Sequence, residues 1–171
     1  MDRRSKQHLD DYELGDDGSY EYRGTYWRWS KPQERATFLR SSWGLLAGAV
    51  ACLVAAGFVP VSGLGFATLA LLPYAVAAVA AALTAAALLR LTREGERLRD
   101  LTYQRSVLTL GAKVGLGSVA SMASGVGCTA TLVMGWGAVP MCVSFAALMV
   151  VAGILLAQLL RKVRALSFVQ E

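Results

Sequence analysis

The long apolar runs of this chain contain no aspartate or glutamate, and its single histidine, His8, lies outside them. Proton-coupled carriers usually need a buried ionisable relay, and metal or nucleophilic chemistry needs partnered histidine, cysteine or carboxylate side chains. We therefore predict that the protein is not an enzyme and that it holds no metal and no cofactor.

Cysteine is scarce as well. The three cysteines, Cys52, Cys128 and Cys142, all lie in apolar runs and show no CxxC spacing. Zinc sites and redox motifs are typically built from closely spaced cysteines. These thiols are therefore expected to be buried and free, and to pack as small hydrophobic side chains.

Charge is low and unevenly distributed. Charged residues form 17% of the chain, compared with roughly 25% in ordinary soluble domains. Residues 1–41 hold 16 of them, 90–105 hold eight and 161–171 hold four, so that Lys113 is the only one elsewhere. The remaining runs are too apolar for water to solvate, which predicts a membrane protein. The pI near 9.4 then reflects the basic flanks of membrane helices, and we expect no binding to nucleic acid.

Apolar sequence is what the chain has in abundance, at 55% of its residues. A helix of about 20 apolar residues crosses a hydrocarbon core of ~30 Å, and four runs approach or exceed this length. The predicted fold class is an all-α membrane protein with four transmembrane helices in an up-down bundle. Pro73 lies near the start of the second run and is expected to kink or weaken it. The predicted spans are residues 42–59, 66–89, 107–134 and 141–160.

The positive charges predict the orientation. Sixteen of the seventeen lysines and arginines lie in the N-terminal region, the middle loop or the tail, and none lies in the short turns at 60–65 and 135–140. Cytoplasmic loops are enriched in such residues. The pattern predicts a multi-pass protein of the cell membrane with two outward hairpins and with both ends, residues 1–41 and 161–171, in the cytoplasm. The basic flanks are expected to contact anionic headgroups of the inner leaflet, and no cleavable signal peptide is expected.

The N-terminal region divides near residue 20. Residues 1–19 are polar and acidic and are expected to be largely disordered, whereas 20–41 form an aromatic and basic segment in which Arg23 and Gly24 favour a small hairpin. Aromatic rings and arginines favour membrane interfaces, but they also dominate protein hot spots. Two interpretations stay open, an interfacial membrane anchor and a docking segment for a partner. The residues concerned are Tyr20, Tyr22, Tyr26, Trp27, Arg28 and Trp29.

The middle loop, residues 90–105, is predicted to extend a membrane helix. Leu91, Leu98 and Leu101 would lie on one stripe if this segment were helical. We therefore expect an amphipathic helical extension beyond the second span.

The third span is rich in small and hydroxylated residues, with Lys113 near its cytoplasmic end. Small residues let helix backbones approach closely, which favours a packing face. A polar groove lined by hydroxyls is the alternative. Lys113 either extends its stem toward the interface or lies in that groove, where it would contact an anionic substrate or headgroup. The residues concerned are Lys113, Gly111, Gly115, Ser118, Ser121, Gly125 and Thr129.

Three short segments carry a resemblance. The order YEYRGTYWRW, then LLPY at residues 71–74 and YQRSV at 103–107, resembles a group of uncharacterised four-helix bacterial membrane proteins. The resemblance covers the layout of most of the chain and implies the same four-helix arrangement. It implies no activity for any residue.

Two functions are consistent with these observations. The first is a non-enzymatic accessory or scaffold subunit of a membrane complex, which has a protein partner or forms a homo-oligomer. It rests on the aromatic N-terminal segment, the small-residue third span and the missing catalytic groups. The alternative is a small oligomeric transporter or channel subunit, which rests on the hydroxyl-rich third span and Lys113.

Overall fold

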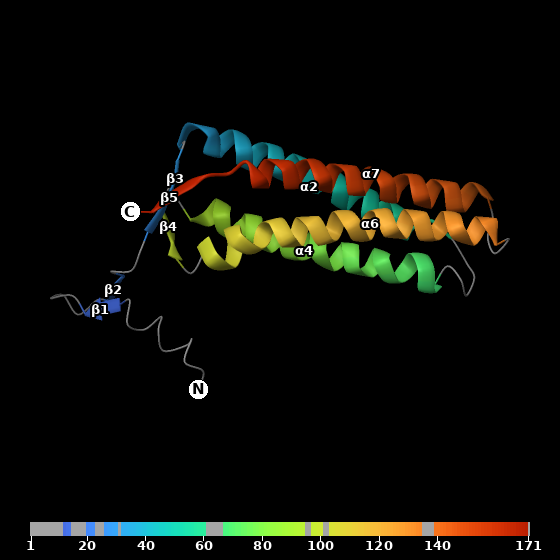
Figure 1. The fold of residues 1–171 in the computed structure, drawn as a ribbon, viewed down its shortest axis with the longest axis horizontal. Helices are drawn as coiled ribbons and strands as arrows, with labels where there is room; N and C mark the ends of the chain where they lie inside the picture. The colour runs from blue at the N-terminus through green and yellow to red at the C-terminus, as the bar shows by residue number, and fades with distance from the viewer. Residues whose placement is uncertain are drawn as a thin grey trace.

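Four long helices dominate the computed structural model, and each is long and apolar enough to cross a membrane. This confirms the prediction of four helices with the length and apolar composition of membrane spans. Figure 1 shows them alongside one another in an elongated bundle. They are α2 (Pro32–Gly57), α4 (Leu72–Arg93), α6 (Thr109–Val133) and α7 (Val139–Arg164). The structure describes residues 12–14, 20–22, 26–30, 32–60, 67–94, 97–100, 103–134 and 139–170.

The helices run further than the predicted spans. Helix α2 begins at Pro32, before the predicted apolar span at 42–59, and α7 continues to Arg164, beyond the predicted span at 141–160. Apolarity marks only the part of a helix that hydrocarbon can cover. Backbone hydrogen bonding continues into the polar flanks, so α2 carries charged residues in its first turns and α7 carries them in its last turn.

Helix α6 lies at the centre of the packing. It contacts both α4 and α7, while α2 packs mainly against α7. Small side chains such as Ala49, Ala77 and Ala152 are fully buried between helices. Larger apolar side chains lie outside, and Val119 and Val133 are 68% and 90% exposed. Helices that are apolar on all faces are typical of membrane spans, where the outer faces contact lipid.

Two π-helical segments precede helices, η1 (Ala67–Leu71) before α4 and η2 (Tyr103–Leu108) before α6. Pro73 has no amide hydrogen, so the carbonyl of Leu69 lacks the donor that a regular α-helix would supply. The irregular helix start predicted at Pro73 is therefore present as the π-helical turn before it.

A three-stranded antiparallel sheet joins three distant parts of the chain. Its central strand β3 (Tyr26–Trp29) pairs with β4 (Arg97–Arg99) on one side and with β5 (Phe168–Gln170) on the other. Strand β3 precedes α2, β4 lies between α4 and α6, and β5 follows α7. The sheet lies at one end of the bundle (Figure 1), and we call this region the sheet end.

Two predictions about local structure are wrong. The hairpin expected around Arg23 and Gly24 does not form, because β2 (Tyr20–Tyr22) pairs with β1 (Tyr12–Leu14) while β3 pairs with β4 and β5. The helical extension of the middle loop is replaced by β4, in which Leu98 is fully buried. Both segments find strand partners that are remote in sequence, and such pairings are invisible to local periodicity.

The prediction that residues 1–19 are disordered lies mostly outside the described residues. Within that range only Tyr12–Leu14 is described, and it forms strand β1. Leu101 of the predicted middle-loop stripe also lies outside the described residues.

Candidate functional site

An aromatic cluster holds the sheet end to the helices. Trp29 of β3 is only 4% exposed. Its ring centroid lies 5.7 Å from that of Phe38 on α2 and 4.9 Å from that of Phe168 on β5. Tilted ring pairs at such separations are favourable geometries. Trp29 is therefore a core residue of this end, and its ring has little surface left for a membrane interface or a partner.

Trp27 fastens the sheet to the segment that leads into α6. Its ring stacks on Tyr103 with centroids 4.1 Å apart and planes 8° apart. Its Nε1–H donates to Oδ1 of Asp100 at 2.9 Å. Tyr103 in turn meets Phe168 edge-on at 5.4 Å. Trp27 thus bridges β3 to the middle of the chain, a structural role that the sequence analysis did not predict.

The other residues of the predicted interfacial segment differ from the tryptophans. Arg28 is exposed and Tyr26 is half-buried. Both make contacts within the molecule. The side chains of Tyr20 and Tyr22 lie outside the described residues. Arg28 is therefore the exposed side chain among the predicted interfacial residues whose side chains the structure describes.

Arg35 of α2 fastens the C-terminal end of α4. Its Nη2 donates to the carbonyl of Glu94 at 2.8 Å, with the carbonyls of Leu91 and Thr92 at 3.5 Å each. Nearby, Nε1 of Trp43 donates to Oγ1 of Thr92 at 3.2 Å. A cation is favourable against the carbonyls that a helix leaves unpaired at its C-terminus. These bonds add to the sheet in fixing the sheet end.

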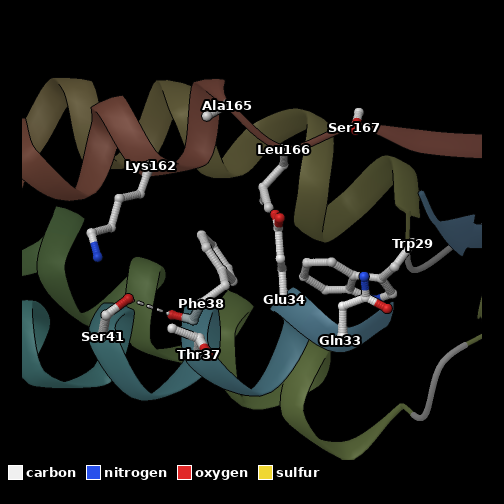
Figure 2. Close-up of a pocket in the computed structure, with 10 residues that line it drawn as sticks. All are labelled: Trp29, Gln33, Glu34, Thr37, Phe38, Ser41, Lys162, Ala165, Leu166 and Ser167. Carbon is white, nitrogen blue, oxygen red and sulfur yellow. Dashed lines mark hydrogen bonds between the residues drawn. The ribbon is translucent and has the colours of Figure 1, made fainter. Parts of the chain in front are cut away.

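An open cleft of about 370 Å³ lies between α2 and the end of α7. Figure 2 shows Lys162 extending from α7 toward α2, with the ring of Phe38 standing beside it and Ser41 donating to the carbonyl of Phe38 at 3.0 Å. We call it the α2–α7 cleft. Its lining comprises Trp29, Gln33, Glu34, Thr37, Phe38, Ser41, Lys162, Ala165, Leu166 and Ser167.

The hydroxyls of the third span lie between helices. Ser118 donates to the carbonyl of Gly153 on α7 at 2.9 Å, and Ser124 donates to the carbonyl of Ala70 in η1 at 2.7 Å. Ser121 is fully buried. Thr129 is exposed instead and donates to the carbonyl of Val126 in its own helix at 2.8 Å. Ser118 and Ser124 therefore bond to different neighbours of α6, namely α7 and η1, whereas Thr129 bonds within its own helix.

The glycines of α6 differ in how closely their neighbours approach. A Cβ added at Gly125 would lie 3.3 Å from Val150 and 3.4 Å from the carbonyl oxygen of Ala146. At Gly127 it would overlap the backbone carbonyl of Leu69. At Gly111 and Gly115 it would meet only Leu160, at 4.0 and 3.7 Å. We call the tight surface the α6 seam, which comprises Gly117, Ser118, Ser121, Ser124, Gly125 and Gly127.

Lys113 lies apart from these serines. It is on α6 near the sheet end, half-buried, and Arg90 of α4 is a like-charged neighbour. Lys113 also makes contacts of its own within the molecule.

The described residues contain no group of three histidine, cysteine, aspartate or glutamate side chains that could hold a metal ion. The three cysteines are free. Cys128 and Cys142 are fully buried, and the thiol of Cys128 donates to the carbonyl of Cys142 at 3.5 Å.

Sequence reasoning missed the α2–α7 cleft and the residues that hold the sheet end. Phe168 and Lys162 were part of a basic tail in the sequence, and Arg35 was one of several flanking cations. The only signal for β5 was the short apolar and aromatic stretch after the last basic residue, Arg164. Comparisons with protein-family models, curated proteins and solved structures find no match for this chain.

Proposed function

We propose that this chain is a non-enzymatic integral membrane protein that serves as an accessory or scaffold subunit of a membrane complex. One observation carries the proposal: the serines of the α6 seam are buried between the chain's own helices, and two of them donate to neighbouring backbone carbonyls. Ser118 and Ser124 therefore bond to neighbouring segments of the bundle instead of lining a conduction path. What remains accessible is apolar helix surface and the outer face of the sheet end.

The sheet end favours a role in assembly. The sheet and the Arg35 contacts fasten the start of α2 to the end of α4 and to the segment after α7. Partners that dock on pre-organised surfaces avoid part of the ordering cost of association. Arg28 projects from the central strand as an exposed cation, and arginine is enriched in protein hot spots.

We place the sheet end in the cytoplasm of a cell-membrane protein with an up-down arrangement and both termini inside. Support comes from the cations at the helix ends nearest the sheet, since cytoplasmic flanks are enriched in lysine and arginine. The described residues at the opposite helix ends, such as Phe58, Pro60, Met134 and Val139, are uncharged. The cations are Arg35, Arg40, Arg90, Arg93, Arg161, Lys162 and Arg164.

Cysteine labelling tests this orientation. In a variant without native cysteines, Ser62→Cys and Ala138→Cys are expected to react with an impermeant thiol reagent added to intact cells. Ala165→Cys and Ser167→Cys, both at exposed positions near the sheet, should react only after the cells are opened. The reverse pattern would contradict the proposed orientation.

The scaffold role is tested by purification from native membranes in a mild detergent. We expect a second protein to co-purify in fixed stoichiometry and to be lost in Arg28→Ala. Arg164→Ala removes the same charge from another exposed position near the sheet and should retain the partner. Recovery of the chain alone, together with solute flux in reconstituted vesicles, would instead support a transporter or channel subunit.

A further inference from the structure

The α2–α7 cleft combines an apolar base with polar groups on both walls. Phe38 and Leu166 supply apolar surface, Thr37 and Ser41 supply hydroxyls from α2, and Lys162 extends from α7 across the opening (Figure 2). Thr37 and Ser41 are four residues apart and therefore lie on one face of the helix. Such a combination suits a ligand that has both an anionic and an apolar part.

The cleft lies where both of its helices change from polar to apolar sequence. On α2 the apolar run begins at residue 42, directly after Ser41, and on α7 it ends at residue 160, two residues before Lys162. In a helix that spans a bilayer, this change marks the boundary between hydrocarbon and headgroups. The polar groups of the cleft therefore lie at the depth of lipid phosphates, and this placement is independent of the scaffold role.

The lining of the cleft carries one cation, Lys162, and one carboxylate, Glu34, so the excess of positive charge comes from the arginines beside the lining. Lys162 is preceded by Arg161 and followed by Arg164, and both arginines are exposed at the same end of α7. Glu34 is the acidic residue of the described lining, and it makes contacts within the molecule. A lysine at the headgroup level attracts phosphate directly, and neighbouring cations strengthen the local field.

Gly44 lies at an open position on α2 next to the cleft, on the side of the apolar run. Gly44 is three residues below Ser41 on α2, and a Cβ added there would meet no atom within 4 Å. Gly48, one turn further, packs against Leu155 of α7, whose Cδ1 would lie 3.2 Å from an added Cβ. No side chain therefore occupies the surface of α2 at Gly44, whereas Leu155 covers the surface at Gly48. The open surface at Gly44 leaves room for the first part of an acyl chain.

We propose that the α2–α7 cleft binds the headgroup of an anionic phospholipid. The ammonium of Lys162 contacts the phosphate, the hydroxyl of Thr37 donates to it from α2, and an acyl chain lies along Gly44. Ser41 already donates to the carbonyl of Phe38, so Thr37 supplies the donor from this wall. A lipid reaches the cleft by lateral diffusion within the bilayer, whereas a free anion would reach it from the cytoplasm.

Native mass spectrometry of the detergent-solubilised full chain tests this site. The protein is titrated with phosphatidylglycerol or phosphatidylcholine, and the number of retained lipids is counted. Wild type is expected to retain one phosphatidylglycerol, with phosphatidylcholine bound at least about tenfold more weakly. Lys162→Gln should weaken phosphatidylglycerol retention about tenfold, as expected for loss of a charged hydrogen bond. Arg164→Gln, which removes the same charge outside the lining, should change it less than about twofold.

A second pair of variants tests the acyl path. Gly44→Leu fills the open space beside Ser41 and should weaken lipid retention without lowering thermal stability. Ala55→Leu enlarges an exposed position on the same helix away from the cleft and should leave retention unchanged. Equal losses in Lys162→Gln and Arg164→Gln, equal retention of the two lipids, or full competition by inorganic phosphate would each overturn the proposal.

Discussion

The sheet end and the α6 seam hold the molecule together in opposite ways. At the sheet end, large rings such as Trp27 and Trp29 bridge strands and helices that are distant in sequence. Along the α6 seam, residues such as Gly125 and Gly127 bring backbones and small side chains together. The sheet end therefore depends on large side chains, and the α6 seam depends on small ones. Truncation of a side chain should destabilise the sheet end, and enlargement of a side chain should destabilise the seam.

Enlargement of the seam is expected to have the largest effect. Gly127→Ala places a Cβ against the backbone carbonyl of Leu69, which cannot move away as a flexible side chain can. We expect a loss of at least ~3 kcal/mol in the free energy of unfolding, at the upper end of overpacking costs. Thermal unfolding in detergent measures it.

Gly115→Ala is the matched control for this enlargement. Its added Cβ would meet only Leu160 at 3.7 Å, an ordinary contact. Since alanine is the better helix former, we expect unchanged or slightly raised stability. Equal changes in stability for Gly115→Ala and Gly127→Ala would show that the close approach of Gly127 to Leu69 of η1 does not determine the stability of the seam.

Truncation at the sheet end is expected to be nearly as costly. Trp29→Ala removes a ring that packs on Phe38 and Phe168, and truncation of a buried tryptophan typically costs ~3 kcal/mol or more. We expect the loss to appear first as faster amide exchange in β3 and β5, measured by hydrogen–deuterium exchange, because the sheet can open while the helices stay packed. Uniform protection of both strands would contradict this role.

A smaller effect is expected from the hydrogen bond of Trp27. Trp27→Phe keeps a ring to stack on Tyr103 but removes the donor to Asp100. We expect a loss of ~1 kcal/mol, and a double-mutant cycle with Asp100→Ala should assign it to this pair. Gln104→Ala removes the other side chain that donates to Asp100 and should cost less, because that bond is exposed. Additive effects of Trp27→Phe and Asp100→Ala would exclude the bond as a source of stability.

The smallest effect is expected from the hydroxyl of Ser118. Ser118→Ala removes a bond to the carbonyl of Gly153 without changing the shape of the seam. Hydrogen bonds between membrane helices contribute ~0.6 kcal/mol on average, so a loss of this size is expected in thermal unfolding. Ser144→Ala, which removes an exposed bond within α7, should have no measurable effect. A loss of stability well above ~0.6 kcal/mol would contradict this estimate and would show that the Ser118 hydrogen bond contributes more than an average bond between membrane helices.

The glycines of α6 have different surroundings that the sequence could not distinguish. Gly115 and Gly125 belong to small-residue rows with the same spacing, and the sequence treats them alike. In the structure Gly125 meets the backbone of α7, whereas Gly115 faces the end of Leu160. The distinction depends on the rotation of α6 and on its partners, which the composition of one helix cannot specify.

The four long helices could be predicted from the sequence alone, because a single segment that crosses hydrocarbon can pair all of its own backbone groups only as a helix, and such a segment must be long and largely apolar. The tertiary structure decides the rest. It pairs β3 with β4 and β5 across the length of the chain, buries Trp29 against Phe38 and Phe168, and forms a cleft from residues of α2 and α7. Each of these features needs contacts between segments that are remote in sequence, and no local pattern records which distant strand or helix face will meet.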